Sequence, residues 1–126
     1  MTRKQLLLYW TSTTLLSIGM FSGGIAQIMQ AEPNKEGILQ LGYPLYFMTI
    51  IGIWKVLGVI TILLPKMKIF KEWAYAGFFF VLTGAVFSHI MSGDSYSELI
   101  APITLLILTI VSWYIRPASR KIAFTY

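Results

Sequence analysis

The sequence predicts an all-α integral membrane protein, an antiparallel bundle of four transmembrane helices that forms a single domain over residues 1–126. Two observations support this prediction. Hydrophobic residues make up 56% of the chain and charged residues only 12%, whereas about a quarter of a typical soluble domain is charged. The apolar residues also gather in four long runs, at about residues 6–29, 45–64, 73–91 and 99–115.

The length of each run suits a membrane-spanning helix. At about 1.5 Å of rise per residue, a helix over each run matches a hydrocarbon core of about 30 Å, and the last run is slightly short. A helix satisfies its own backbone hydrogen bonds in lipid, which an open sheet cannot do. The runs also lack the alternating pattern of a membrane β-strand. Helices are therefore expected throughout.

Turn and breaker residues separate the runs. Residues 30–44 include two prolines and two glycines, a composition that predicts a connection. Pro65 ends the second run, residues 92–95 end the third, and Pro117 ends the fourth. Short connections favour antiparallel neighbours, so an up-down bundle is the simplest architecture.

The placement of charge predicts the orientation. Two basic residues precede the first run, three lie in the second connection and three follow the last run, while Lys35 is alone in the opposite connections. The positive-inside rule then places both termini in the cytoplasm of a multi-pass protein, in a cell membrane of the bacterial plasma or inner type. The basic residues of the inner side are Arg3, Lys4, Lys66, Lys68, Lys71, Arg116, Arg120 and Lys121.

A cleaved signal peptide is the alternative for the first run, because Arg3 and Lys4 precede it. The run is long for such a segment, and it has no convincing cleavage site beyond Gly24-Ile25-Ala26. A retained helix is the preferred interpretation.

The composition argues against several classes of function. The net charge of +5 does not predict a nucleic-acid partner, because the basic residues flank apolar runs and set topology. Cysteine is absent, so the chain itself supplies no thiol for redox chemistry or metal binding. A phosphate-binding glycine loop, paired intramembrane carboxylates and a Ser/His/Asp set are also missing, which disfavours a stand-alone enzyme.

Small residues at helical spacing predict the faces on which the helices meet. In lipid such residues mark helix contacts, because apolar side chains gain little by leaving one oily phase for another. The glycines expected in these contacts are Gly24, Gly52, Gly58, Gly77 and Gly84.

Lys55 is the most informative candidate for function. It lies ten positions into the second run, about 15 Å deep by helical rise and hence near the membrane midplane. Placing an ammonium group there costs at least about 2.5 kcal/mol of insertion free energy. An ionisable residue at this depth is therefore expected by default to have a function. The flanking Gly52 and Gly58 indicate that it points into the bundle. The alternative is a structural lysine held by Ser17, Gln27 or backbone carbonyls.

Other residues, among them Gln27 and Ser17, are candidates for the same ligand site. His89, near the outer end of the third run, is the single histidine and therefore not a zinc site by itself. It is expected to pair with Asp94 or to exchange a proton. Trp54 and Tyr46 could line an outward-facing cavity, although aromatic residues at such positions more often form the interfacial belt.

Several segments, taken in order, resemble the DoxX-like family of small four-helix membrane proteins. The segments that carry the resemblance are Gly52–Gly58, Leu63–Pro65, Lys71–Gly77, Gly84-Ala85, Ser88-His89 and Gly93-Asp94.

The resemblance implies a ligand-binding or accessory subunit of a membrane redox system, with a quinone or another lipophilic molecule as the ligand. Because cysteine is absent, the dithiol role of some redox relatives is not expected here. Two alternatives stay open: a chaperone or assembly factor for membrane proteins, and a small proton-coupled transporter. The expected partners are the lipid bilayer and other membrane subunits or further copies of the chain.

Overall fold

The computed structural model describes residues 2–120 and 122, and its regular elements are all helical. Lys121, which we counted among the basic residues of the inner side, lies outside the described residues. The elements in chain order are α1 (Arg3–Ile28), α2 (Glu32–Gln40), α3 (Leu45–Leu63), α4 (Lys68–Met91), α5 (Ser97–Tyr114) and the short 3₁₀ helix η1 (Ala118–Arg120). The four long helices agree closely with the four predicted runs.

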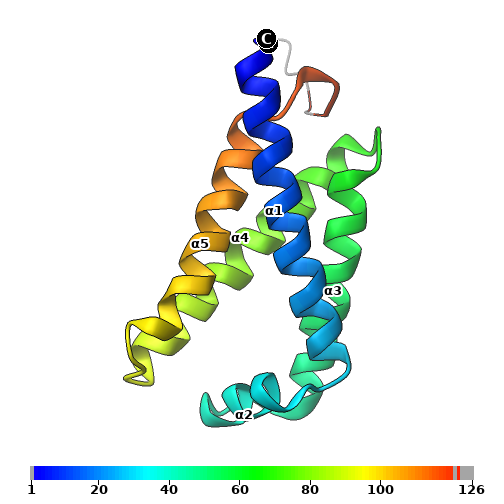
Figure 1. Cartoon of the computed structure of the whole chain (residues 1–126). Coiled ribbons are helices and arrows are strands. Elements are labelled where there is room, and N and C mark those ends of the chain that lie inside the picture. Colours follow the sequence, from blue (N-terminus) through cyan, green and yellow to red (C-terminus); the bar gives the residue numbers. More distant parts are fainter. Residues whose placement is uncertain (1, 121, 123–126) are drawn as a thin grey trace.

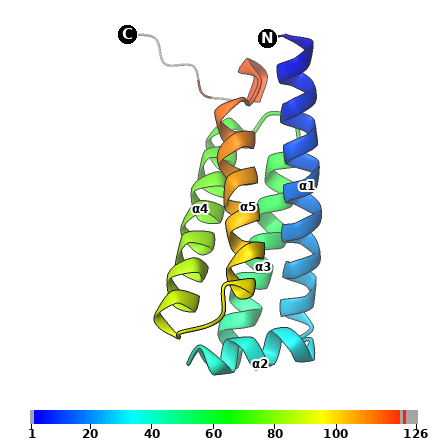
Figure 2. The same ribbon diagram turned by 60° about the vertical axis from the view of Figure 1, so that its left-hand side comes forward.

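The long helices α1, α3, α4 and α5 run alternately in opposite directions, so α1 begins and α5 ends at the same end (Figure 1). Helix α1 packs against α3 and α5, and α4 packs against α5 and α3. The short helix α2 lies across the opposite end (Figure 2). We call these the terminal end and the α2 end.

The described helices bear out an all-α membrane protein. By length and composition, α3, α4 and α5 can each cross a membrane. Helix α1 is not among these three, although its 26 residues make it the longest. Four consecutive hydroxyl residues, Thr11 to Thr14, lower its hydropathy.

Helix α2 is an addition to the predicted four-helix bundle, because it forms within the predicted connection 30–44. Pro33 does not prevent this helix, since it stands in the first turn, where its missing N–H would be unpaired anyway. Gly42 follows the helix with a φ of +88°, the left-handed conformation in which helices commonly end. Both breakers thus mark the boundaries of a helix.

The apolar core lies where α1, α3, α4 and α5 meet. Gly58 of α3 supports it, because a Cβ there would come within 2.5 Å of the Phe78 ring, so only glycine admits that ring. The buried cluster consists of Leu16, Met20, Val59, Ile62, Tyr75, Phe78 and Leu82.

Gly77 and Gly84, predicted to pack helices, make no such contact within the chain. A Cβ on either would meet no atom of residues 2–120 and 122 within 4 Å. Helix α4 buries Tyr75, Phe78 and Leu82 instead. These large side chains fill the space between α4 and the neighbouring helices. Gly24, Gly52 and Gly58 do lie in helix contacts. Among the described residues, three of the five predicted packing glycines thus make the expected contacts.

A buried hydrogen-bonded cluster joins three helices toward the terminal end. Thr13 of α1 and Ser112 of α5 lie 2.6 Å apart, oxygen to oxygen. The hydroxyl of Tyr75, on α4, lies 2.7 Å from the same Ser112 oxygen. Such bonds hold helices together where the hydrophobic effect contributes little.

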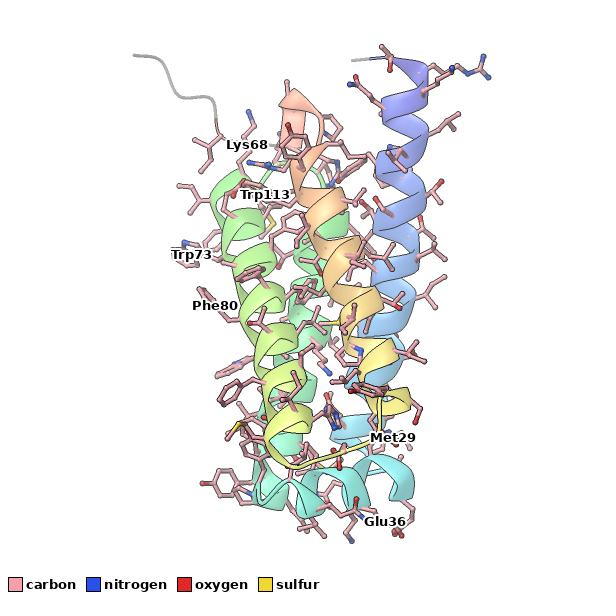
Figure 3. All side chains as sticks on the ribbon, turned by 90° about the vertical axis from the view of Figure 1, so that its left-hand side faces the viewer. Met29, Glu36, Lys68, Trp73, Phe80 and Trp113 are labelled. Carbon is pink, nitrogen blue, oxygen red and sulfur yellow. The ribbon has the colours of Figure 1, made fainter. Side chains whose placement is uncertain are left out.

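Two cations cap the last carbonyls of α3 at the terminal end. Lys71, only 1% exposed, donates to the carbonyl oxygens of Thr61 and Leu64. Arg120 donates to the carbonyls of Ile62, Leu63 and Leu64. Both therefore satisfy backbone oxygens that have no partner inside the helix. Figure 3 shows Lys68 at this end and Glu36 on α2 at the other.

Candidate ligand-binding cavity at Lys55

Lys55 lies just past the middle of α3, with its aliphatic stem against α1. A Cβ placed on Gly24 would stand 3.1 Å from the Cβ of Lys55 and 2.9 Å from the Gly52 carbonyl oxygen. The absent side chain of Gly24 therefore makes room for the lysine at the α1–α3 contact. Lys55 is half-buried, and beyond this contact it lines two cavities.

The first cavity, about 300 Å³ in volume, lies toward the α2 end and is bounded by α1, α2, α3 and α4. We call it the Lys55–Gln27 cavity. Its polar lining residues are Gln27, Tyr43, Lys55 and Ser88. The remaining lining residues are apolar or small: Ile38, Leu41, Phe47, Ile51, Phe80, Val81, Gly84 and Ala85.

The polar groups of this cavity differ in whether they have a partner. The hydroxyls of Tyr43 and Ser88 lie 2.7 Å apart and satisfy each other. The side-chain oxygen of Gln27 is buried and has no hydrogen-bond partner in the part of the chain that the structure describes. Within residues 2–120 and 122, the Lys55 ammonium makes neither a hydrogen bond nor an ion pair. Lys55 therefore brings to this cavity a charged donor that has no partner among the described residues.

The second cavity, about 580 Å³, is a groove between α3 and α4, and Lys55 also lines it. Trp54, Phe70, Trp73 and Phe78 give it aromatic walls, so we call it the aromatic groove. In Figure 3, Trp73 projects from α4 away from the bundle. The groove is thus open to the surroundings of the helices and could admit an apolar tail.

The other predicted site residues are not part of the Lys55–Gln27 cavity. His89 Nδ1 lies 2.6 Å from a carboxylate oxygen of Asp94, the pairing that the sequence predicts. Tyr46 is 68% exposed. Ser17 is buried on α1, and its hydroxyl has no hydrogen-bond partner among the described residues. Trp54 contributes to the aromatic groove only.

Comparison with known proteins identifies the family. The sequence model of the DoxX-like family matches residues 11–112, most of the chain. The chain belongs to the DoxX-like family. The matched residues run from α1 to near the end of α5 and include every lining residue of the Lys55–Gln27 cavity. No curated protein and no solved structure shows significant similarity to this DoxX-like chain.

The buried role of one basic residue in this DoxX-like protein was not predicted. Lys71 was expected to mark the inner side of the membrane, and it belongs to a segment that resembles the family. Yet Lys71, Tyr75, Phe78 and Leu82 follow one another at intervals of four, three and four, which places them on one helix face. That spacing could have predicted that Lys71 shares the buried face of α4.

A second group of bonded polar side chains, at the terminal end of α4 and α5, could not be predicted from any local pattern in the sequence. Arg116 and Glu72 form an ion pair at 2.7 Å, and the Trp113 indole N–H donates to Glu72 at 3.0 Å. These residues stand more than 40 positions apart, so only the fold brings them together. Both charges have partners, unlike Lys55.

Proposed function

We propose that this DoxX-like protein binds a lipophilic ligand of the quinone type as an accessory subunit of a membrane redox system. Lys55 holds the polar head of the ligand in the Lys55–Gln27 cavity. The observation that carries the proposal is the unpaired ammonium group beside a cavity of about 300 Å³. Pockets of this size commonly hold small ligands, with a few polar groups fixing their orientation.

The proposal places the chain across the cell membrane four times, with α1 as the fourth span and both termini cytoplasmic. The alternating directions of the four long helices support this topology (Figure 1). The basic residues near the terminal end support the orientation. Lys55 then lies near the membrane midplane. Inserting its charge there costs about 2.5 kcal/mol or more of free energy, which argues for a functional role.

A binding measurement tests the proposal. Purified protein in mild detergent is titrated with a decyl-substituted benzoquinone, and the Lys55→Met variant is compared with the wild type. A hydrogen bond from a charged group contributes about 1.5–3 kcal/mol, so we expect the variant to bind roughly ten- to hundredfold more weakly. Lys68→Met, at an exposed position, is the matched control. Unchanged affinity in Lys55→Met would remove the proposal.

A second candidate, an assembly factor for other membrane proteins, is favoured by the exposed Gly77 and Gly84, which line the aromatic groove and the Lys55–Gln27 cavity, respectively. A Cβ on either glycine would meet no atom of the described residues within 4 Å, and small residues let a partner helix approach closely. Because the chain has no cysteine, Gly84→Cys provides a unique site for a crosslinker in native membranes. Capture of one membrane protein at a fixed stoichiometry supports this function, and recovery of the bare chain argues against it.

A further inference from the structure

The connection between α3 and α4 brings two lysines to one pocket at the terminal end. Lys66 lies in the connection and Lys68 begins α4, and both line a pocket of about 540 Å³. We call it the basic pocket. Ser119 of η1 also lines it. Two positively charged side chains and one hydroxyl therefore share a single space.

The cations of the terminal end differ in whether the fold already uses them. Lys71 and Arg120 donate to carbonyl oxygens of α3, and Arg116 forms an ion pair with a glutamate. Within residues 2–120 and 122, neither Lys66 nor Lys68 forms an ion pair. The described lining of the basic pocket also contains no carboxylate. The charge of this pocket is thus left for an anion from outside the chain.

The remaining lining of the basic pocket is apolar and exposed. Ile69 is 56% exposed and Phe70 50% exposed, and Met67 and Ile122 complete the lining. Phe70 also lines the aromatic groove, and its ring centroid lies 5.2 Å from that of Trp73. Figure 3 shows Lys68 at the terminal end and Trp73 further along α4. An occupant that fits both parts has an anionic head and an apolar chain.

We propose that the basic pocket binds the phosphate head group of an anionic phospholipid, with an acyl chain beside Phe70 and Trp73. Clusters of basic residues next to a transmembrane helix attract anionic lipids. A soluble phosphate compound has nothing to place against the exposed apolar residues. A zwitterionic phospholipid brings a cation of its own, which Lys66 and Lys68 repel.

A comparison of lipids tests the proposal on the full chain in a neutral detergent. Native mass spectrometry gives the dissociation constants of phosphatidylglycerol and of phosphatidylcholine with the same acyl chains. A lysine near the head groups contributes about fivefold in affinity, so we expect the two lysines to favour phosphatidylglycerol roughly twentyfold. Glycerol phosphate, which keeps the anionic phosphate but has no acyl chain, should not displace phosphatidylglycerol at an equal concentration.

Glutamine variants assign the preference to the basic pocket. Lys66→Gln and Lys68→Gln should each weaken phosphatidylglycerol binding about fivefold, and the double variant should bind it within about threefold of phosphatidylcholine. The matched control is the double variant Arg3→Gln/Lys4→Gln. It removes two exposed cations, neither of which lines the pocket, and should change the affinity less than about twofold.

The phospholipid and the ligand proposed for Lys55 are different molecules at different sites. Lys55 is not among the described residues that line the basic pocket. Lys55→Met should therefore bind phosphatidylglycerol like the wild type, whereas Lys68→Met should lose phospholipid but keep the Lys55 ligand. Loss of phosphatidylglycerol in Lys55→Met would place the lipid outside the basic pocket and overturn the proposal.

The other outcomes are equally decisive. Equal affinities of the wild type for the two phospholipids would overturn the proposal. So would a preference that survives in the Lys66/Lys68 double variant, or that falls equally in Arg3→Gln/Lys4→Gln, because the attraction would then belong to the basic chain as a whole. Displacement by glycerol phosphate at an equal concentration would assign the pocket to soluble phosphate compounds instead of a lipid.

Discussion

Gly24 and Gly52 meet backbone to backbone where α1 crosses α3. A Cβ on Gly24 would lie 2.9 Å from the Gly52 carbonyl oxygen, and a Cβ on Gly52 would lie 2.6 Å from the Gly24 carbonyl oxygen. A real Cβ atom cannot come this close to a carbonyl oxygen unless the backbone shifts. This close contact seats the stem of Lys55 against α1 and so sets the geometry of the proposed site.

Alanine at either glycine is expected to push α1 and α3 apart. Gly24→Ala and Gly52→Ala should each destabilise the fold by about 1–3 kcal/mol, as overpacked contacts do. The measurement is reversible unfolding in mixed detergent micelles. Gly77→Ala and Gly84→Ala are matched controls, because a Cβ there meets nothing within 4 Å. Equal effects at all four glycines would contradict the observed contact.

Lys71→Met is expected to destabilise the terminal end. It leaves the carbonyl oxygen of Thr61 without the Lys71 donor and removes one of the two donors to the carbonyl oxygen of Leu64, at a cost of about 1–3 kcal/mol. Lys68→Met removes the same charge from an exposed position (Figure 3) and should change stability little. Both variants are compared by unfolding in micelles, and identical stabilities would contradict the capping role.

The Thr13–Ser112 hydrogen bond predicts coupling between α1 and α5. In a double-mutant cycle of Thr13→Val and Ser112→Ala, we expect an interaction of about 0.6 kcal/mol and at most about 1.7 kcal/mol. Ser22→Ala replaces Ser112→Ala in the control cycle, since Ser22 bonds only to a carbonyl of its own helix. Strict additivity in the Thr13–Ser112 cycle would show that this bond contributes nothing.

The proposed topology predicts which sites an impermeant thiol reagent reaches on intact cells. Lys4→Cys, before the hydrophobic part of α1, should react only after the membrane is permeabilised. Glu36→Cys, on α2, should react at once. Reaction of both residues from the same side would show that α1 does not cross the membrane.

Much of the fold could be predicted from the sequence because the surrounding lipid determines which segments form long helices. Lipid requires long apolar runs and internally satisfied backbones, so the four long helices end within a few residues of the predicted limits. Helix α2 was missed because Pro33 and Gly42 were interpreted as breakers inside a connection, whereas they bound a helix. The packing glycines were predicted only in part, because the fit of the Phe78 ring against Gly58 depends on matching shapes that the positions of small residues do not reveal.

The site was predictable only in part. The depth of Lys55 and its glycine neighbours are local features of the sequence, and Gln27 was already a candidate partner. The Tyr43–Ser88 and Glu72–Arg116 pairs depend on helix rotations that no single run specifies. The cavity itself arises from three helices together with the unpredicted α2.

The most direct test of the central claim is the small-molecule content of the protein as it leaves the membrane. Wild-type, Lys55→Met and Lys68→Met proteins are purified in the same mild detergent, and their bound compounds are identified by mass spectrometry. We predict that a lipophilic molecule with a polar head accompanies the wild type and Lys68→Met and is depleted about tenfold or more in Lys55→Met. The same content in all three proteins would contradict a ligand held by Lys55.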